Sequence, residues 1–117
     1  MIGLLLSDDL IFNSRVSATA RAYGSTVTPV KTIAALLAKA QESPPVAAIL
    51  DLQHSPFDLP ELLTALKAIG SIRVVAYGAH VDAERLKAAK EAGCDIVLTR
   101  SKFVNKLETD LPAWLGQ

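Results

Sequence analysis

The acidic residues that follow two apolar runs are the part of the sequence best suited to chemistry. The run Val46–Leu50 ends in Asp51, and the run Ile2–Leu6 is followed closely by Asp8 and Asp9. Crowded carboxylates repel each other unless a proton or a cation relieves them. Mg²⁺ suits such a cluster, because it takes one or two carboxylates, a carbonyl and several waters. One interpretation is therefore a Mg²⁺-dependent phospho-aspartate site.

Helix capping offers a second interpretation of the same acids. Asp8, Asp9 and Asp58 all precede helical patterns, where a carboxylate accepts backbone N–H groups. Asp51 would then be an ordinary strand-end acid. Arg100 follows another short apolar run, and a cation there would help to hold a phosphoryl oxygen. Spacing alone leaves both interpretations open.

Short apolar runs alternate with helical patterns along the chain. We expect buried strands over residues 2–6, 25–30, 46–51, 72–77 and 96–98. Helices fill the intervals, with Asp58, Asp82 and Ser101 as expected N-caps and Gly24, Gly70 and Gly93 as expected ends. Pro112 is expected to end or bend the last helix. This alternation predicts an α/β fold with a parallel sheet between helices.

Two features predict the order of the strands. Pro29 indicates an edge strand, because proline cannot donate to the hydrogen-bond ladder. The run before Asp51 is typical of a central strand buried on both faces. These positions suit the order 2-1-3-4-5 of a flavodoxin-like, doubly wound (βα)5 sheet in a three-layer α/β/α sandwich. The carboxyl ends of the strands would then bring Asp8 and Asp9 near Asp51.

Composition limits the class of protein. The 117 residues fit one domain, residues 1–117, and twelve basic side chains balance twelve acidic ones. No net field therefore favours nucleic acid or a membrane surface. Residues 1–6 are too short an apolar run for a signal peptide or a membrane span. Cys94 is the single cysteine, so no internal disulfide can form and a cytoplasmic location is expected.

The chain resembles response-regulator receiver domains of the CheY-like family over essentially its whole length. The residues that carry the resemblance are Asp8-Asp9, Leu50-Asp51-Leu52, Ala76-Tyr77-Gly78-Ala79-His80 and Ala92-Gly93-Cys94-Asp95, in this order and spacing.

The resemblance implies roles for individual residues. Asp51 would accept a phosphoryl group, and Asp8 and Asp9 would bind Mg²⁺ together with Asp51. A second register pairs Ser7 with the first acid of the family, and Asp8 is acidic in either register. The backbone carbonyl of Gln53 would complete the protein ligands. In the family, the metal and a lysine stabilise the transferred group.

Several positions depart from the family pattern. Gly78 stands where receivers have the Ser or Thr that contacts the phosphoryl group, and Val97 stands at the aromatic switch position. Arg100 replaces the lysine, and arginine is longer, planar and forked. Ser101 replaces the proline after it, and Pro56 lies one residue later than expected. The acceptor is kept while the readout is altered, which is typical of an atypical receiver or pseudo-receiver.

His54 and His80 fall on loops at the same edge of the predicted sheet. Three protein ligands at the spacing typical of a zinc site are not evident, which disfavours zinc. We therefore expect partly exposed loop residues that modulate water access to Asp51. Tyr77 and Trp114 are expected to be packing residues.

These observations predict a stand-alone signalling module of the two-component type, and not an enzyme. Its expected partners are proteins: a histidine kinase, a downstream target, or a second copy in a homodimer. In the family the usual surface is formed by the last two helices and the strand between them, where Lys87, Lys90, Lys102 and Lys106 lie. The alternative is a phosphorylation-independent scaffold.

A small flavodoxin-like enzyme or cofactor carrier is a further alternative. Flavin binding needs a loop after the first strand that cradles phosphate. The segment Ser7-Asp8-Asp9-Leu10 places negative charge there. A cobalamin carrier needs an Asp-x-His-x-x-Gly loop, which the sequence lacks. Both cofactors are therefore disfavoured.

Overall fold

The structure, a computed structural model, describes residues 2–54 and 57–116. Strands and helices alternate along these residues. The strands are β1 (Ile2–Leu6), β2 (Thr26–Val30), β3 (Ala47–Asp51), β4 (Arg73–Gly78) and β5 (Ile96–Thr99). The helices are α1 (Leu10–Ala22), α2 (Ile33–Glu42), α3 (Leu59–Ile69), α4 (Ala83–Ala92) and α5 (Arg100–Trp114).

All strand pairs are parallel, and the sheet has the order β2-β1-β3-β4-β5. The predicted flavodoxin-like order is therefore confirmed. Pro29 lies in the edge strand β2, opposite Leu5 of β1. Every residue of β3 is buried, as expected for a strand between two helical layers.

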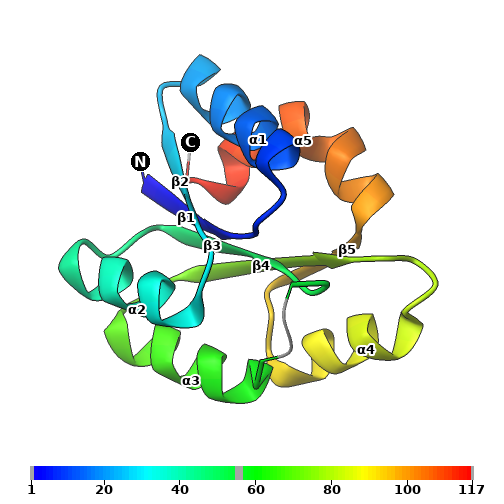
Figure 1. The fold of residues 1–117 in the computed structure, drawn as a ribbon. Helices are drawn as coiled ribbons and strands as arrows, with labels where there is room; N and C mark the ends of the chain where they lie inside the picture. The colour runs from blue at the N-terminus through cyan, green and yellow to red at the C-terminus, as the bar shows by residue number, and fades with distance from the viewer. Residues whose placement is uncertain (1, 55–56, 117) are drawn as a thin grey trace.

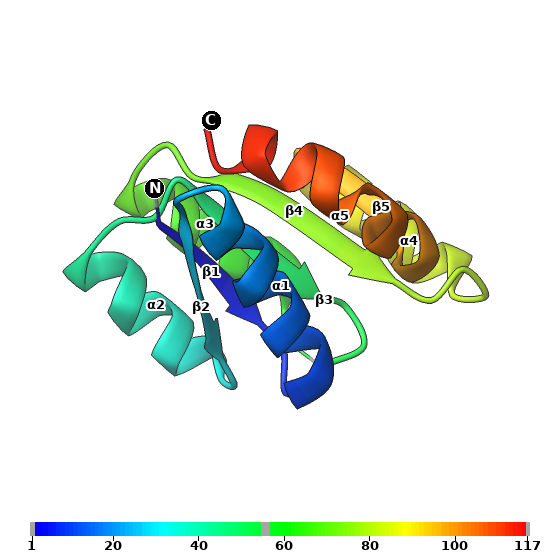
Figure 2. The same ribbon diagram turned by 90° about the horizontal axis from the view of Figure 1, so that it is seen from above.

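The helices form a layer on each face of the sheet (Figure 1). Helices α1 and α5 cover one face, and Figure 2 shows them lying alongside each other. Helices α2, α3 and α4 cover the other face. The core under α2, α3 and α4 is mainly aliphatic. The core under α1 and α5 contains four aromatic side chains in contact, Phe12, Tyr77, Phe103 and Trp114.

The start of α5 corrects one prediction. Thr99, and not Ser101, is the N-cap, because its Oγ1 accepts the Lys102 amide at 3.2 Å. β5 runs directly into α5 without a loop. Thr99, the last residue of β5, therefore has the extended backbone that an N-cap residue needs, whereas Ser101 already lies inside the helix. Asp58 and Asp82 cap α3 and α4 as predicted.

The end of α5 and the bounds of four strands also differ from the predictions. Pro112 lies inside α5, which continues to Trp114. Burial of Trp114 and Leu115 favours the extra turn despite the lost N–H donor. β2 and β3 each begin one residue late, at Thr26 and Ala47. β4 is shifted by one residue so that it includes Gly78, and β5 continues by one residue to Thr99. None of the helices in the described part of the chain is long and apolar enough to cross a membrane.

Candidate functional site

Asp51 is the last residue of β3 and is only 6% exposed. Its Oδ1 accepts the backbone N–H of Gln53 at 2.9 Å. Burial raises the pKa of the Asp51 carboxyl, and the charge of Asp8 adds to this. The Gln53 amide, Arg100 and His54 act in the opposite direction on the same pKa. A cation at this edge would therefore favour the ionised carboxylate.

The two neighbouring acids have different surroundings. Asp9 is the N-cap of α1, and its Oδ1 accepts the Phe12 amide at 3.0 Å. Its Oδ2 accepts Arg100 Nη2 at 2.9 Å. These hydrogen bonds hold the pKa of Asp9 below its ordinary value. The Asp8 side chain is 65% exposed, and its Oδ2 lies 3.8 Å from His54 Nδ1. Asp8 is thus the acid of this pair that is open to a ligand.

Arg100 points towards the site. Besides its hydrogen bond to Asp9, its guanidinium carbon lies 4.6 Å from the centroid of the Phe12 ring. This stacking on an aromatic face is an interaction that guanidinium groups favour. The positive charge is therefore held at the edge by α1, on the side of Asp9.

Gly78 lies at the end of β4 in a closed position. A Cβ atom there would lie 3.4 Å from Leu52 Cβ and 3.4 Å from Leu86 Cδ2. Arg85 Nη1 also donates to the Leu52 carbonyl at 2.6 Å, which ties α4 to the segment after β3. The space that a Ser or Thr side chain occupies in receivers is thus bordered by packed side chains.

The two histidines differ in exposure. His80 is exposed in the loop before α4, as expected. The His54 side chain is more buried than predicted, at 7% exposed, and its Nε2 lies 2.6 Å from the Lys31 carbonyl. Pro56 lies outside the described residues. His80, Gln53 and Arg100 line an open cavity of about 450 Å³ between the β4–α4 loop and α5.

The residues at this edge provide the oxygen ligands that a hard divalent cation such as Mg²⁺ prefers. Asp8 and Asp51 offer carboxylate oxygens, and the backbone of Gln53, whose N–H contacts Asp51, carries a carbonyl of the kind that such a cation accepts. Asp9 already uses both carboxylate oxygens for α1 and Arg100. In the described residues, no three His, Cys, Asp or Glu side chains cluster closely enough to enclose a metal ion. Waters would therefore supply much of the coordination, as Mg²⁺ prefers.

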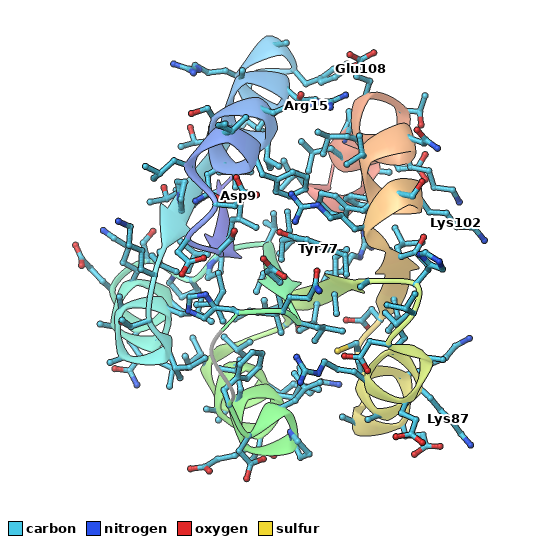
Figure 3. All side chains as sticks on the ribbon, turned by 45° about the vertical axis from the view of Figure 1, so that its right-hand side comes forward. Asp9, Arg15, Tyr77, Lys87, Lys102 and Glu108 are labelled. Carbon is cyan, nitrogen blue, oxygen red and sulfur yellow. The ribbon has the colours of Figure 1, made fainter. Side chains whose placement is uncertain are left out.

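Tyr77 is a packing residue whose hydroxyl is buried close enough to Asp51 to be affected by its charge. It is fully buried, and its ring stacks on Phe103 with centroids 4.5 Å apart. Burial raises the pKa of the hydroxyl well above its usual range, and the charge of Asp51 adds to this. Figure 3 shows Tyr77 between α1 and α5 at the centre of the molecule. The contact between Phe12 and Arg100 has no signal in the sequence, because it joins residues that only the tertiary structure brings together.

The face formed by α4, β5 and α5 carries a shallow groove of about 310 Å³. Its lining consists of Leu86, Lys87, Lys90, Val97, Leu98, Thr99 and Lys102. Lys87 and Lys102 project outwards from α4 and α5 (Figure 3). Val97, at the aromatic switch position, is half-buried and packs against the aliphatic core. The groove thus has an apolar floor and a basic rim.

No family model matches the sequence, and no curated protein matches it. The fold has solved counterparts. A two-component response regulator from Clostridium difficile matches with a TM-score of 0.82 at 14% identity, over 98% of this chain and 95% of that one. The beryllofluoride-activated NtrC4 receiver domain dimer matches with a TM-score of 0.77 at 17% identity, over 97% and 98%. The Mn²⁺-bound form of response regulator Rcp1 matches with a TM-score of 0.76 at 18% identity, over 99% and 95%.

These similarities cover nearly the whole chain, and they agree with the strand order and the helical layers described above. The chain has the fold of a response-regulator receiver domain.

Proposed function

We propose that this chain is a receiver-like signalling module of the two-component type, in which Asp51 accepts a phosphoryl group and the α4–β5–α5 face binds a protein partner. The observation that carries this proposal is the position of Asp51. It is a nearly buried carboxylate at the carboxyl end of the central strand, with Asp8 and Arg100 acting on its pKa. The module acts by binding and not by turnover of a substrate.

Asp51 has one oxygen suited to attack. Because Oδ1 accepts the Gln53 amide, we assign Oδ2 as the nucleophile. Oδ2 forms a bond to the phosphorus of a phosphoryl donor, and the donor's bond to that phosphorus breaks. The leaving group takes the bonding electrons, and an aspartyl phosphate results. A divalent cation, when bound, supplies positive charge for the phosphoryl oxygens.

Arg100 would contribute to holding the product. Its guanidinium has five N–H donors, and Asp9 takes one from Nη2. A phosphoryl group on Asp51 would compete with Asp9 for the N–H donors of this guanidinium. The expected donor is a phosphohistidine of a sensor kinase, as the resemblance to receivers implies. The Mn²⁺-bound state of Rcp1 supports a divalent cation in this fold.

The chemistry of the α4–β5–α5 groove indicates the kind of partner. Lys87, Lys90 and Lys102 surround an apolar floor that includes Leu86 and Val97. An acidic segment with apolar anchors, such as an amphipathic helix, would complement this groove. A second copy of the chain is the other candidate, and the dimeric NtrC4 receiver domain gives a precedent in this fold.

A phosphorylation-independent scaffold is the second candidate function. The observations that favour it are the Asp9–Arg100 hydrogen bond and the closed packing at Gly78. Arg100 is engaged by Asp9, and Gly78 offers no hydroxyl at the position where a receiver carries one. In this case the same groove would bind its partner constitutively.

Backbone-amide NMR tests the two candidates. The protein is titrated with Mg²⁺ and then with beryllofluoride, a phosphoryl mimic, using wild type, Asp51→Asn and the matched control Asp58→Asn. Asp58 is exposed and caps α3, so its amide variant keeps the cap and leaves the site intact. We expect shifts near Asp8, Asp51 and Arg100 in wild type and Asp58→Asn only.

How far the chemical-shift changes extend from Asp51 distinguishes a phosphorylation switch from a constitutive scaffold. Shifts that reach α4 and α5 would support a working switch. Spectra that stay unchanged in millimolar Mg²⁺ and mimic would overturn the phospho-acceptor proposal and leave the scaffold. Light scattering at several protein concentrations would detect a homodimer.

A further inference from the structure

His54 has a buried ring nitrogen without a hydrogen-bond partner. Among the described residues, nothing accepts from or donates to its Nδ1. The side chain is 7% exposed, so bulk water does not take the place of a partner. A buried polar atom left in this state carries a free-energy cost unless something else satisfies it.

The other ring nitrogen determines the tautomer. Nε2 lies 2.6 Å from the Lys31 carbonyl, and a carbonyl oxygen only accepts hydrogen bonds. Nε2 is therefore the protonated nitrogen of the neutral ring, and Nδ1 carries the lone pair. That lone pair faces Asp8, whose Oδ2 lies 3.8 Å away. Two electron-rich atoms thus face each other at the edge of the sheet.

We propose that His54 Nδ1 and Asp8 Oδ2 together bind a divalent transition-metal ion of the zinc type. Imidazole nitrogen suits Zn²⁺, Co²⁺ and Ni²⁺, whereas Mg²⁺ prefers oxygen ligands only. A metal bound at about 2.1 Å from each ligand fits between atoms at this separation with a wide ligand–metal–ligand angle. A backbone carbonyl that fixes the opposite ring nitrogen is the usual support for a metal-binding histidine.

The remaining ligands would be waters, since no third His, Cys, Asp or Glu among the described residues closes the site. Asp51 lies close enough for His54 and Asp8 to act on its pKa. A metal at this position would therefore place positive charge beside the acceptor. The inference rests on the same acidic edge as the proposed function, because it names the cation class that this edge selects, but it requires no phosphoryl transfer.

Isothermal titration calorimetry with ZnCl₂ and, separately, MgCl₂ tests the proposal. The variants are His54→Gln and the matched control His80→Gln, which changes the chain's other histidine on the same edge. Glutamine can still donate to the Lys31 carbonyl, so His54→Gln keeps the loop contact. We expect wild type and His80→Gln to bind Zn²⁺ roughly tenfold or more tightly than Mg²⁺. His54→Gln should lose this preference while its Mg²⁺ affinity stays unchanged.

A spectroscopic measurement keeps the test independent of variant stability. In wild-type protein, Co²⁺ should shift or broaden the imidazole signals of His54 and the amide of Lys31 before those of His80. Equal Zn²⁺ affinity in wild type and His54→Gln would overturn the proposal, and so would Co²⁺ effects centred on His80.

The beryllofluoride titration separates this proposal from the proposed function. A response to the mimic in Mg²⁺, with no preference for Zn²⁺, would reject the His54–Asp8 site and keep the phospho-acceptor. A Zn²⁺ preference that depends on His54, without any response to the mimic, would keep the His54–Asp8 site and reject the phospho-acceptor.

Discussion

The two halves of the sheet's carboxyl edge are built differently. The acceptor half, named after the role proposed for Asp51, consists of Asp8, Asp51 and Gln53 after β1 and at the end of β3, which carry oxygen donors. In the readout half, formed by Gly78 and Val97 on β4 and β5, Leu52 and Leu86 close the space beside Gly78, and Val97 is half-buried in the floor of the α4–β5–α5 groove. Arg100 belongs to neither half, because Asp9 and Phe12 hold it against α1. One edge of the same sheet thus keeps a set of oxygen donors in one half, while the compared positions of the other half, Gly78 and Val97, carry no polar side chain.

Gly78→Thr gives the largest expected effect, because it forces a side chain into the closed readout half. Its Cβ would lie 3.4 Å from both Leu52 and Leu86. We expect a loss of about 2 kcal/mol in the free energy of unfolding, measured by urea denaturation. The matched control is Gly70→Thr, where the backbone is extended and the added Cβ meets open space. It should change stability by less than about 0.5 kcal/mol. Equal losses in the two variants would show that the readout half is not closed.

Arg100→Ala removes the link between α5 and the start of α1. It deletes the hydrogen bond to Asp9 and the stacking on Phe12. We expect a loss of about 0.5 to 1 kcal/mol in the free energy of unfolding, mainly from the lost stacking on Phe12, because Arg100 and Asp9 are both more than a third exposed and an ion pair of this kind adds little. Lys106→Ala, on an exposed position of α5, is the control and should be nearly neutral. If Arg100→Ala is as neutral as the control, the arginine is not held and remains available to a phosphoryl group.

Asp51→Asn is expected to stabilise the protein when metal is removed with EDTA. Burial raises the folded-state pKa of Asp51 above that of the unfolded chain, so ionisation is less favourable in the folded state. This cost is fully present above the folded pKa and disappears as the pH falls below the unfolded one. We expect a gain in the free energy of unfolding at pH 7 that shrinks as the pH falls. Chemical denaturation at several pH values measures it, and a gain that grows in acid would contradict a raised pKa for Asp51.

Val97→Tyr has the smallest expected effect on stability, below about 0.5 kcal/mol, because Val97 is only half-buried. The variant is most informative when combined with Gly78→Thr. The double variant places a Thr and an aromatic residue at the two positions where the receiver pattern has them. NMR with the phosphoryl mimic then tests the comparison directly. Mimic-induced shifts that extend into α4 only in the double variant would show that these two positions had disconnected the halves. Val81→Tyr, on an exposed loop position, is the control.

Much of the fold could be predicted from the sequence, because it follows from local patterns. The buried run before Asp51 and the edge proline Pro29 were sufficient for the strand order. Asp58 and Asp82 cap helices as their spacing predicts. Errors arose where two local signals competed. Thr99 and Ser101 are both good caps, and the length of β5 decided between them.

The candidate site was predictable only in position. Parallel strands bring their carboxyl ends to one edge, so the sequence by itself determined that Asp51 and Asp8 would lie there. It did not determine what each side chain contacts. Arg100 bonds to Asp9, which is 91 residues away in the chain, and His54 contacts Lys31, which is 23 residues away. Only the tertiary structure decides such contacts, because a side chain's conformation depends on partners from other elements, which local periodicity does not encode.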